Sequence, residues 1–594
     1  MEYPTLGTIQ TSRDMINEFK GYNHNLIISE SEFFNMENMT SDNYPTLSTR
    51  KPRARYGVAL NVKAIIAKDA LAYVAGQSLI YNGETVYDAL STEEPKQLVS
   101  MGAYLIVFPD GFYVNTKDLT DKGHLGLTHT VNENQGNVSF KICDIDGAEY
   151  DYISQATAPE NPDNGTYWLD TSENVHSLKV YSSLTAMWNS VPTVYVKISY
   201  PGIGVGFSKY DGVKIKIQDT DGNLKTYEWA DLWNSKTSIL YGCGDDYIIV
   251  VGILDSEQTI TNKITIAREI PIMDYVCENQ NRLWGCRYGT NAEGKVVNEI
   301  YASKQGDPKN WNCFMGLSTD SYAVSLGSDG VFTGAASHAG YPLFFKENCF
   351  HKIYGSMPSE YQTQEVKARG VQKGSFRSLV TVNETLFYKS DKCVCAYDGS
   401  LPVSVSDALG NEIYTDAVAG TLGDKYYISM KDSSGEWHLF ACDTNRGVWH
   451  REDNTHAIGF AALDGDLFYF TADNPNPDMY SLYCINGTKG MQRTKFDWYV
   501  ESGIIGYLYP DNKYVSRFNI RMIAKPGTKV SLYIQYDSNP KWEHKGTMEG
   551  KTLRSFTLPV IPRRCDHFRI KIAGHGEVQI LSISKTLEIG SDVV

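Results

Sequence analysis

The feature that most constrains this chain is a strand–turn–strand unit that recurs along most of its length without a strict sequence repeat. In each copy two apolar or aromatic segments flank a turn, and the unit often closes on Asn-Gly, Asp-Gly or Tyr-Gly. Clear copies lie at residues 71–83, 104–115, 343–355, 386–399 and 467–487. Alternating apolar residues with Gly or Asn at the turns predict β-hairpins. Because one small antiparallel sheet cannot bury both of its faces, hairpins repeated in this way predict a β-propeller.

The spacing of the units supports a propeller and indicates how many blades it has. In the second half of the chain the units begin near Arg282, Leu343, Leu386, Lys425 and Leu467, and the last three intervals are 43, 39 and 42 residues. A four-stranded blade is expected to take ~40–45 residues. Two further units lie at about 64–90 and 96–119. The sequence therefore predicts six to eight blades.

Changes in polarity and in the pattern of predicted strands divide the chain into five parts. Residues 1–57 are expected to form an extended N-terminal arm, and residues 58–121 the first propeller blades. Residues 122–265 carry long polar stretches and acidic turns, and are expected to form an inserted β-rich domain that allows one short helix at 185–190. Residues 266–495 hold the remaining blades, and the longer strands of 496–594 predict a C-terminal β-sandwich. The expected fold class is all-β.

The arm contains the residues that we single out as a candidate contact site. It is basic toward its end, without an acid among its last basic residues. Such a segment is expected to lie over a neighbouring subunit, and the alternative is a solvated loop, as most basic runs are. The candidate inter-subunit contacts are Tyr44, Arg50, Lys51, Arg53 and Arg55.

Composition limits the classes of function. The 594 residues include 55 Lys and Arg against 70 Asp and Glu, a net charge of −15, which disfavours tight sequence-independent binding to DNA. The 40 Tyr residues suit half-exposed strands with large contact surfaces. The eleven Cys form no CxxC pair and predict free thiols in a reducing cytoplasm. No signal peptide is expected, since the start MEYPTLGTIQ has no basic n-region and no apolar h-region. No membrane span is expected, since no stretch approaches ~18 consecutive apolar residues.

Motifs for catalysis are absent from the sequence. There is no GxSxG nucleophile elbow, no Walker A loop and no HExxH, and the histidines show no metal spacing. Residues 303–311 (SKQGDPKNW) are similar to the Asp-box turn of sialidases, which is structural and supports a propeller. No pair of carboxylates stands out for glycoside hydrolysis. We therefore expect no catalytic, cofactor-binding or metal-binding residues, and a protein that is not an enzyme.

Several segments resemble one family. Residues 343–409 contain LFFKENCFHKIYG, GVQKGSFRSLVTVNETLFY and AYDGSLPVSVSDAL in that order. This order is similar to that of the tail-nozzle or packaged-DNA-stabilisation (tail hub) proteins of short-tailed bacteriophages. The arm at 35–57, the GDPKNW segment and residues 563–569 (RRCDHFR) also resemble such proteins. The resemblance does not extend to residues 122–265.

The resemblance implies a structural role in the virion. Proteins of this family form a ring, usually a hexamer, that extends the DNA channel below the adaptor or portal complex. The ring helps to retain the packaged genome and anchors fibres or a needle. The implied partners are other copies of the chain, these tail components, and passing genomic DNA without sequence-specific binding. The implied location is the virion tail, after assembly in the host cytoplasm, with no cofactor.

Two alternatives remain open. The first is a receptor- or glycan-binding protein of the tail tip that uses the inserted domain, with the aromatic residues Tyr167, Trp168, Tyr181 and Trp188. These side chains would serve equally well as core residues. The second is a propeller enzyme that cleaves glycans.

Overall fold

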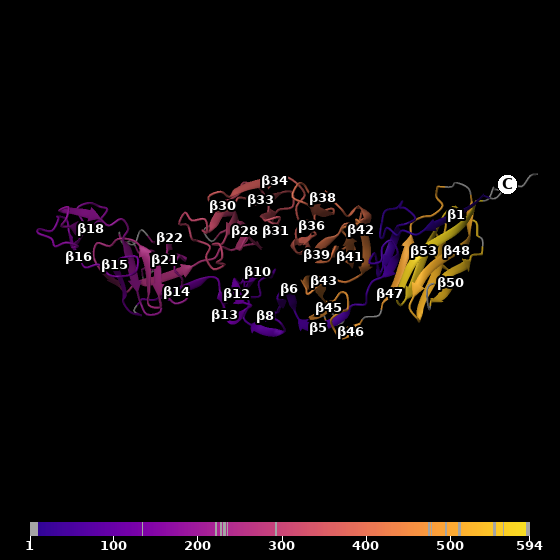
Figure 1. The fold of residues 1–594 in the computed structure, drawn as a ribbon, viewed down its shortest axis with the longest axis horizontal. Helices are drawn as coiled ribbons and strands as arrows, with labels where there is room; N and C mark the ends of the chain where they lie inside the picture. The colour runs from indigo at the N-terminus through magenta and orange to yellow at the C-terminus, as the bar shows by residue number, and fades with distance from the viewer. Residues whose placement is uncertain are drawn as a thin grey trace, which may run out of the picture. The chain divides into compact units, whose positions relative to one another are not determined.

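The computed structural model describes residues 10–589, apart from 134, 220–222, 226–228, 230–232, 235, 292–293, 473–475, 477, 494–495, 509–511, 551–553 and 562. Within these residues the fold is all-β, and the short 3-10 turns include η2 (Phe376–Ser378) and η3 (Asp407–Leu409). No helix in this part of the chain is long and apolar enough to cross a membrane. The predicted fold class is confirmed: a β-propeller with an inserted β-rich domain and a C-terminal β-sandwich (Figure 1).

The chain divides into two compact units. The first comprises Met1–Leu98, Gly330–Lys352 and Glu365–Val594, and the second comprises Val99–Asp329 and Ile353–Gln364. The first unit contains most of the propeller sheets and the sandwich. The second contains two propeller sheets and the inserted domain.

Seven antiparallel sheets of four or five strands make up the propeller in the described residues, within the predicted six to eight. The first four sheets are β6 (Val62–Lys68), β7 (Ala70–Ala75), β8 (Ser78–Tyr81) and β9 (Glu84–Tyr87); β10 (Gln97–Met101), β11 (Tyr104–Phe108), β12 (Phe112–Asn115) and β13 (Asp118–His124); β27 (Tyr275–Asn279), β28 (Arg282–Thr290), β29 (Val296–Ala302) and β30 (Tyr322–Ser325); and β31 (Gly334–His338), β32 (Tyr341–Phe345), β33 (Phe350–Tyr354) and β34 (Gln362–Val366). The other three are β35 (Val380–Val382), β36 (Thr385–Lys389), β37 (Val394–Tyr397) and β38 (Val403–Ser404); β39 (Thr415–Leu422), β40 (Lys425–Lys431), β41 (Trp437–Asp443) and β42 (Val448–Asp453); and β43 (Ala457–Leu463), β44 (Asp466–Ala472) and β45 (Met479–Cys484) with β5 (Ala54–Leu60) and β46 (Gln492–Arg493).

The repeats seen in the sequence begin at the second strand of each sheet. The predicted starts fall in β28, β32, β36, β40 and β44. The strands that precede them are weaker signals because several consist largely of small residues, such as GAASH in β31 and AIGFAAL in β43. Small side chains at these positions let neighbouring sheets approach closely, and a Cβ atom added at Gly420 of β39 would lie 2.4 Å from that of Phe460 in β43.

The last sheet takes its fourth strand from near the N-terminus. β5 pairs antiparallel with β45, with Ala54 opposite Cys484 and Leu60 opposite Met479, and Figure 1 shows indigo β5 beside orange β45 and β46. On one face this sheet buries Phe468 and Phe470 against Val62 and Leu71 of the β6–β9 sheet. The strand that precedes the first sheet therefore completes the last one, and the two ends of the blade series are joined by backbone hydrogen bonds.

The C-terminal sandwich consists of two sheets, and the N-terminal segment contributes to both. One sheet contains β48 (Lys513–Ala524), β51 (Arg554–Pro559) and β53 (Val578–Ile589), to which β1 (Gln10–Ile16), β3 (Met39–Thr40) and β4 (Leu47–Thr49) are added. The other contains β47 (Asp497–Ser502), β49 (Thr528–Tyr536), β50 (Glu543–Gly550) and β52 (Phe568–His575), to which β2 (Phe33–Glu37) is added. Trp498, Phe518 and Leu532 are buried between the sheets. The N-terminal segment thus adds strands to the chain's own sandwich.

The inserted domain has its own core and three sheets. Its strands are β14 (Leu127–Val131), β26 (Lys263–Arg268), β21 (Gly212–Gln218) and β22 (Thr237–Ile239); β23 (Gly242–Gly244), β24 (Tyr247–Val251), β20 (Tyr195–Ser199), β15 (Val138–Cys143) and β25 (Gln258–Ile260); and β16 (Tyr152–Gln155), β17 (Tyr167–Asp170), β18 (Ser177–Ser182) and β19 (Met187–Ser190). Phe140 and Trp233 stack at the centre of its core. The short helix expected at 185–190 is wrong, because Met187–Ser190 pairs with β18 as a hairpin.

Candidate functional site: a buried ionic junction

Two of the predicted contact residues take part in a buried cluster of charges. Arg53 lies just before β5, and its guanidinium Nη2 is 2.6 Å from Oε2 of Glu452 while Nη1 is 2.7 Å from Oδ2 of Asp453. Both acids lie at the end of β42, the outer strand of its propeller sheet. The side chains of Arg53 and Glu452 are each 4% exposed. We call Arg50, Arg53, Glu452 and Asp453 the ionic junction.

Neutral groups complete the shell of the junction. Nη1 of Arg53 donates hydrogen bonds to Oγ1 of Thr455 at 2.8 Å and to the hydroxyl of Tyr469 at 3.0 Å. Nε of Arg50 donates to Oδ1 of Asn38 at 2.7 Å, and its guanidinium lies 4.1 Å from the ring centroid of Phe496. The junction therefore has contacts with two propeller sheets, with the segment between β2 and β3, and with the residue that leads into the sandwich.

The adjacent Arg451 extends these contacts to the sandwich. Its Nη1 lies 3.4 Å from Oε2 of Glu37 in β2 and 3.3 Å from the hydroxyl of Tyr499 in β47. Glu37 and Tyr499 are cross-strand partners in one sandwich sheet. Its Nε donates to Nδ1 of His438 within the propeller sheet. Three consecutive charged residues of β42 thus connect propeller, N-terminal segment and sandwich.

Burial and charge act in opposite directions on the junction. Burial disfavours the charge of Arg53, but the carboxylates of Asp453 and Glu452 outweigh it and raise its pKa. Burial likewise disfavours the charge of Asp453, but Arg53 and Arg50 lower the pKa of its carboxyl below the usual value. Burial, with the neighbouring charge of Arg53, lowers the pKa of Arg50 to about 10. A buried ion pair is tolerated where its charges are paired, and both terminal nitrogens of Arg53 face carboxylates, while its Nε has no hydrogen-bond partner among the described residues.

The other three predicted contact residues lie nearer the surface. Tyr44 is half-buried, its hydroxyl donates to the Glu18 carboxylate, and the guanidinium of Arg446 lies 4.9 Å from its ring centroid. Lys51 is exposed, and Arg55 is half-buried within β5. Arg50 and Arg53 are thus engaged inside their own subunit. The role of Tyr44, Lys51 and Arg55 in contacts between subunits stays a prediction.

A polar cavity of about 590 Å³ lies beside the junction. Its lining includes Lys51, Lys425, Asp443, Arg446 and Glu577, so charges of both signs face it. Lys425 and Arg446 are paired within the wall, with Asp42 at 2.5 Å and with Asp443 at 2.6 Å. In the described residues no group of three or more His, Cys, Asp or Glu side chains has the arrangement of a metal site.

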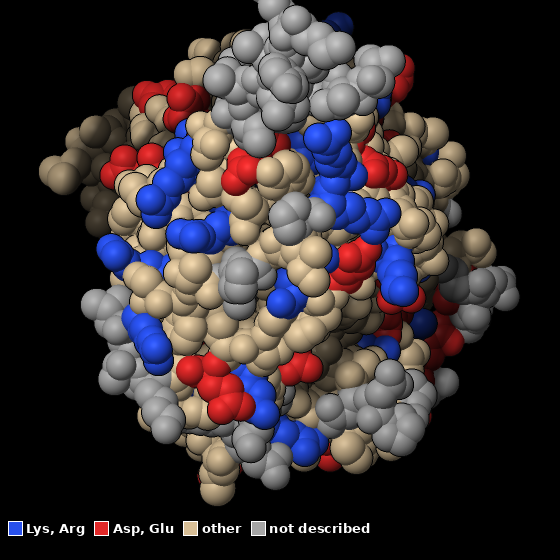
Figure 2. All heavy atoms as spheres, turned by 90° about the vertical axis from the view of Figure 1, so that its right-hand side faces the viewer, with Lys and Arg blue, Asp and Glu red and all other residues tan. Residues whose placement is uncertain are grey.

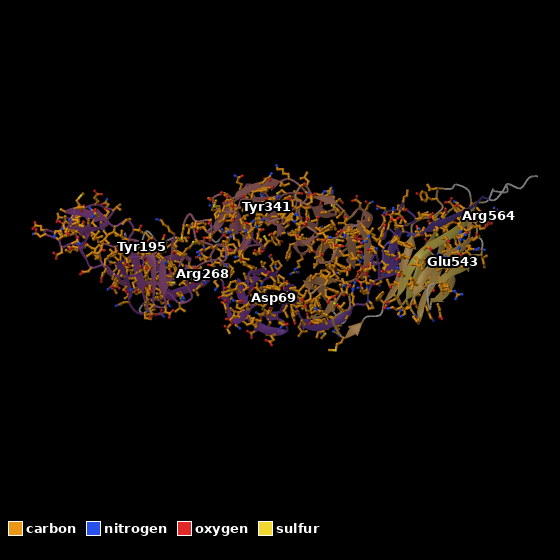
Figure 3. All side chains as sticks on the ribbon, viewed as in Figure 1. Asp69, Tyr195, Arg268, Tyr341, Glu543 and Arg564 are labelled. Atoms are coloured by element: carbon orange, nitrogen blue, oxygen red, sulfur yellow. The ribbon has the colours of Figure 1, made fainter. Side chains whose placement is uncertain are left out.

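A second buried ion pair holds the base of the inserted domain. Nη1 of Arg268, labelled in Figure 3, is 2.6 Å from Oδ2 of Asp211, and its Nε donates to the carbonyl of Leu125. The Asp-box-like segment 303–311 lies against the same region, since Nδ2 of Asn310 donates to the carbonyl of Tyr210 at 2.7 Å. Trp311 is buried and donates to the carbonyl of Pro308. These contacts join the segment to the base of the inserted domain.

The predicted aromatic residues of the inserted domain gather on its smallest sheet. The rings of Trp168 and Tyr181 each lie 5.3 Å from the ring of Trp188, between centroids. Trp168 is buried, whereas Tyr181 and Trp188 are half-buried near an exposed hairpin tip. Tyr167 lies apart from them, 4.7 Å from Tyr150 between ring centroids. The sheet therefore combines a core position with two partly accessible rings.

Sequence reasoning missed the acidic half of the junction. It identified the arginines but not Glu452 and Asp453, which lie about 400 residues further along the chain. One signal was present, because VWHRED places three consecutive charged residues in a strand that begins with Val448 and Trp449. A run of charges in a buried strand requires partners, although the sequence does not say which ones.

Among the comparisons with known proteins, only the one with solved structures found similar proteins. No known family and no curated relative matches the sequence. The chain is similar to an exo-β-1,3-galactanase from Phanerochaete chrysosporium, at 10% identity over 52% of this chain and 94% of that one, with a TM-score of 0.21. It is also similar to a glycoside hydrolase family 43 arabinoxylan arabinofuranohydrolase from Bacillus subtilis, at 7% identity over 52% and 94% of the two chains, with a TM-score of 0.17. An engineered enzyme of family 43 matches at 9% identity over 52% and 97%, with a TM-score of 0.21.

These matches correct one expectation. The sequence-based expectation that the protein is not an enzyme is wrong on this comparison, because the solved structures that the chain resembles are glycoside hydrolases. At identities of 7–10% and TM-scores of 0.17–0.21 the likeness concerns the fold, and it transfers no catalytic residue or substrate.

Replacing Arg53 tests how much the ionic junction contributes to the free energy of unfolding. Arg53→Ala leaves Glu452 buried without its closest cation, so we expect the free energy of unfolding to fall by ~3–5 kcal/mol. Urea unfolding followed by tryptophan fluorescence measures this change. The matched control is Arg563→Ala, since Arg563 is 52% exposed and pairs with Glu543 at 2.7 Å. A surface pair of this kind is worth ~0–1 kcal/mol. Equal effects of the two substitutions would contradict a structural role for the junction.

The lowered pKa of Asp453 predicts a pH dependence of stability. A carboxyl whose pKa is lower in the folded state stabilises the fold above its unfolded pKa, and this contribution is lost as the pH falls through the folded value. We expect wild type to exceed Asp453→Asn by ~1.5–3 kcal/mol at neutral pH, the range for hydrogen bonds to charged groups. The difference should shrink below about pH 4, the usual range of Asp. Urea midpoints measured from neutral pH downward test this, and a constant difference would contradict it.

Proposed function

We propose that the protein is a structural subunit of a bacteriophage tail. In this proposal several copies, six in the family that the sequence resembles, form a ring that continues the DNA channel. The ring helps to retain the packaged genome and anchors other tail components. The proposal rests on the resemblance of residues 35–57, 303–311, 343–409 and 563–569, together with the architecture that these residues help to build.

The observation that carries the proposal is the ionic junction. It ties the N-terminal segment, the propeller and the sandwich together through buried pairs such as Arg53 with Glu452 and Asp453. A ring that bears load needs subunits whose parts do not shift against one another, and opposite charges paired in the interior resist such shifts. Segment 35–57, one of the segments that resemble the phage family, contains both arginines of the ionic junction.

An apolar surface near the sandwich supports contacts between subunits. Leu26, Ile27 and Leu508 are 71%, 66% and 75% exposed. Ile27 and Leu508 line a cavity of about 680 Å³, together with Tyr507 and the paired Lys585. Gathered apolar side chains exposed on a surface are typical of protein–protein contacts.

Charge is distributed unevenly along the chain. Residues 496–594 contain 14 Lys and Arg against 10 Asp and Glu, a net charge of +4 within a chain of −15. Arg517 and Arg521 on β48 and Arg554 on β51 are exposed on neighbouring strands. Figure 2 shows many basic side chains, with acidic ones between them, on the face that the sandwich presents. Opposite net charges on different parts of a subunit favour one orientation during assembly.

The ring can be tested through the exposed residue of the predicted contact set. Lys51→Glu reverses a charge without entering the ionic junction, so we expect it to weaken assembly by at least ~tenfold through like-charge repulsion. Its melting temperature should stay that of wild type. Light scattering after size exclusion, with electron microscopy of the particles, measures assembly. Lys541→Glu in the sandwich is the matched control. Wild type that remains monomeric at high concentration, forms no ring and is absent from virions would contradict the proposal.

A second candidate function is recognition of a glycan by the inserted domain. The observation in its favour is the pair of half-buried rings, Tyr181 and Trp188, beside an exposed hairpin tip where Leu184 is 96% exposed. Aromatic rings of this kind stack on the apolar faces of sugars, and their polar edges satisfy the hydroxyl groups nearby. This function uses a different part of the chain from assembly, so the two are compatible.

Substitution at the hairpin tests glycan recognition. Trp188→Ala should weaken binding on a glycan microarray, whereas Leu184→Ala, which removes an exposed side chain without a ring, should preserve it. We expect a loss of at least ~tenfold in affinity, the scale of one aromatic contact. The glycans that bind are then incubated with wild-type protein, and the release of reducing sugar is measured. Release would indicate a hydrolase. Equal binding by the two variants would contradict recognition through these rings.

A further inference from the structure

Two cysteine thiols lie next to each other at a turn of one propeller sheet. Cys393 closes the turn between β36 and β37, and Cys395 lies two residues further on, in β37. Residues two apart in an extended strand face the same side, and the two Sγ atoms are 3.6 Å apart. All eleven cysteines of the protein are free thiols, so no disulfide is present here.

Polar and cationic groups surround the sulfur of Cys393. Nη1 of Arg369, an exposed residue, donates to its Sγ at 3.1 Å, and the hydroxyl of Ser390 lies 3.3 Å from the same atom. Nζ of Lys389 is bound to the carbonyls of Ser390 and Asp391 in the same turn. A guanidinium and several hydrogen-bond donors beside a thiol stabilise its thiolate form.

The two thiols have opposite electrostatic settings. The hydrogen bond from the Cys395 thiol, with those from Ser390, Ser404 and Arg369, lowers the pKa of Cys393 against the effect of burial. The pKa of Cys395 is raised, first by its hydrogen bond to Cys393 and then by burial. An isolated buried thiol behaves differently, since burial raises the pKa of Cys442 to about 12.

We propose that Cys393 and Cys395 form a redox-active dithiol, in which Cys393 is the nucleophile and Cys395 the resolving thiol. The proposal rests on the 3.6 Å approach of the sulfurs and on the guanidinium of the exposed Arg369 that contacts only one of them. The oxidant is a peroxide. This site is independent of the ionic junction and of assembly.

The reaction balances as a two-electron oxidation. The thiolate of Cys393 attacks one oxygen of hydrogen peroxide; an S–O bond forms, the O–O bond breaks, and the departing hydroxide takes a proton to become water. The Cys395 thiol then attacks the sulfenic sulfur, loses its proton, and displaces hydroxide as a second water. The dithiol is oxidised to a disulfide while the peroxide is reduced to water.

The strand geometry makes this disulfide easy to reopen. At ~3.3 Å per residue, Cα atoms two residues apart in a strand are separated by ~6.6 Å. This lies near the upper end of the ~4.4–6.8 Å that disulfides span. A disulfide formed there has to pull on strand β37, which is held in place because its Val394 and Tyr397 pair with Lys389 and Leu386. We therefore expect a bond that a dithiol reductant cleaves quickly.

One peptide makes the test specific. Trypsin cleavage after Lys392 and Lys425 releases residues 393–425, which contain these two cysteines and no others. After the intact, folded protein is treated with hydrogen peroxide and the remaining thiols are blocked, we expect this peptide to be lighter by about 2 Da through loss of two hydrogens. Dithiothreitol should restore its mass. At pH 6 we also expect Cys393 to react with iodoacetamide at least ~tenfold faster than Cys442, because only Cys393 has thiolate character.

Variants separate the two roles. Cys395→Ser should leave a sulfenic acid on Cys393 that dimedone traps, Cys393→Ser should abolish oxidation of the peptide, and Cys442→Ser should change neither result. Arg369→Gln should move the pH profile of Cys393 alkylation upward. The proposal is overturned if peptide 393–425 keeps both thiols under peroxide that oxidises other cysteines of the protein. It is equally overturned if Cys393 is alkylated no faster than Cys442. Far-UV circular dichroism confirms that each variant is folded.

Discussion

The contact between Arg53 and the paired carboxylates of Glu452 and Asp453 is the interaction on which the rest of this structure depends. It lies where three parts of the first compact unit meet: the N-terminal segment, the outer strand of a propeller sheet and the entry to the sandwich. Apolar packing alone does not specify how such parts are oriented, because it is not directional. A buried guanidinium between two carboxylates is directional, and displacing it would leave charges without partners. The junction therefore fixes an arrangement that the hydrophobic cores stabilise.

The same N-terminal segment closes two sheet systems. Its strands β1–β4 extend both sheets of the sandwich, and β5 completes the last propeller sheet beside β45. Each of these additions covers a sheet edge that would otherwise expose unpaired backbone groups, and such edges are templates for pairing with other chains. Arg50 and Arg53 lie between β4 and β5, so the junction holds the segment at the point where it passes from sandwich to propeller.

Local patterns predicted the fold better than they predicted the site. Alternation and turn residues in the units that contain β32, β36, β40 and β44 were sufficient for the class and the approximate number of blades. The small-residue strands β31 and β43 were weak signals, because their role depends on close approach to neighbours that are distant in sequence. The arginines of the segment were visible as a basic run. Their partners Glu452 and Asp453 were not, since a charge does not indicate which opposite charge it will meet across about 400 residues.

The inserted domain has its own core, and its two ends are held together by a buried ion pair. Its entry and exit are held together at Leu125, Asp211 and Arg268, and the Asp-box-like segment of the neighbouring propeller sheet is anchored against them through Asn310. An insertion whose two ends meet adds little to the loop entropy of the sheets around it, and this one has a core of its own around Phe140 and Trp233. The surface of this domain can therefore change without altering the propeller sheets or the ionic junction.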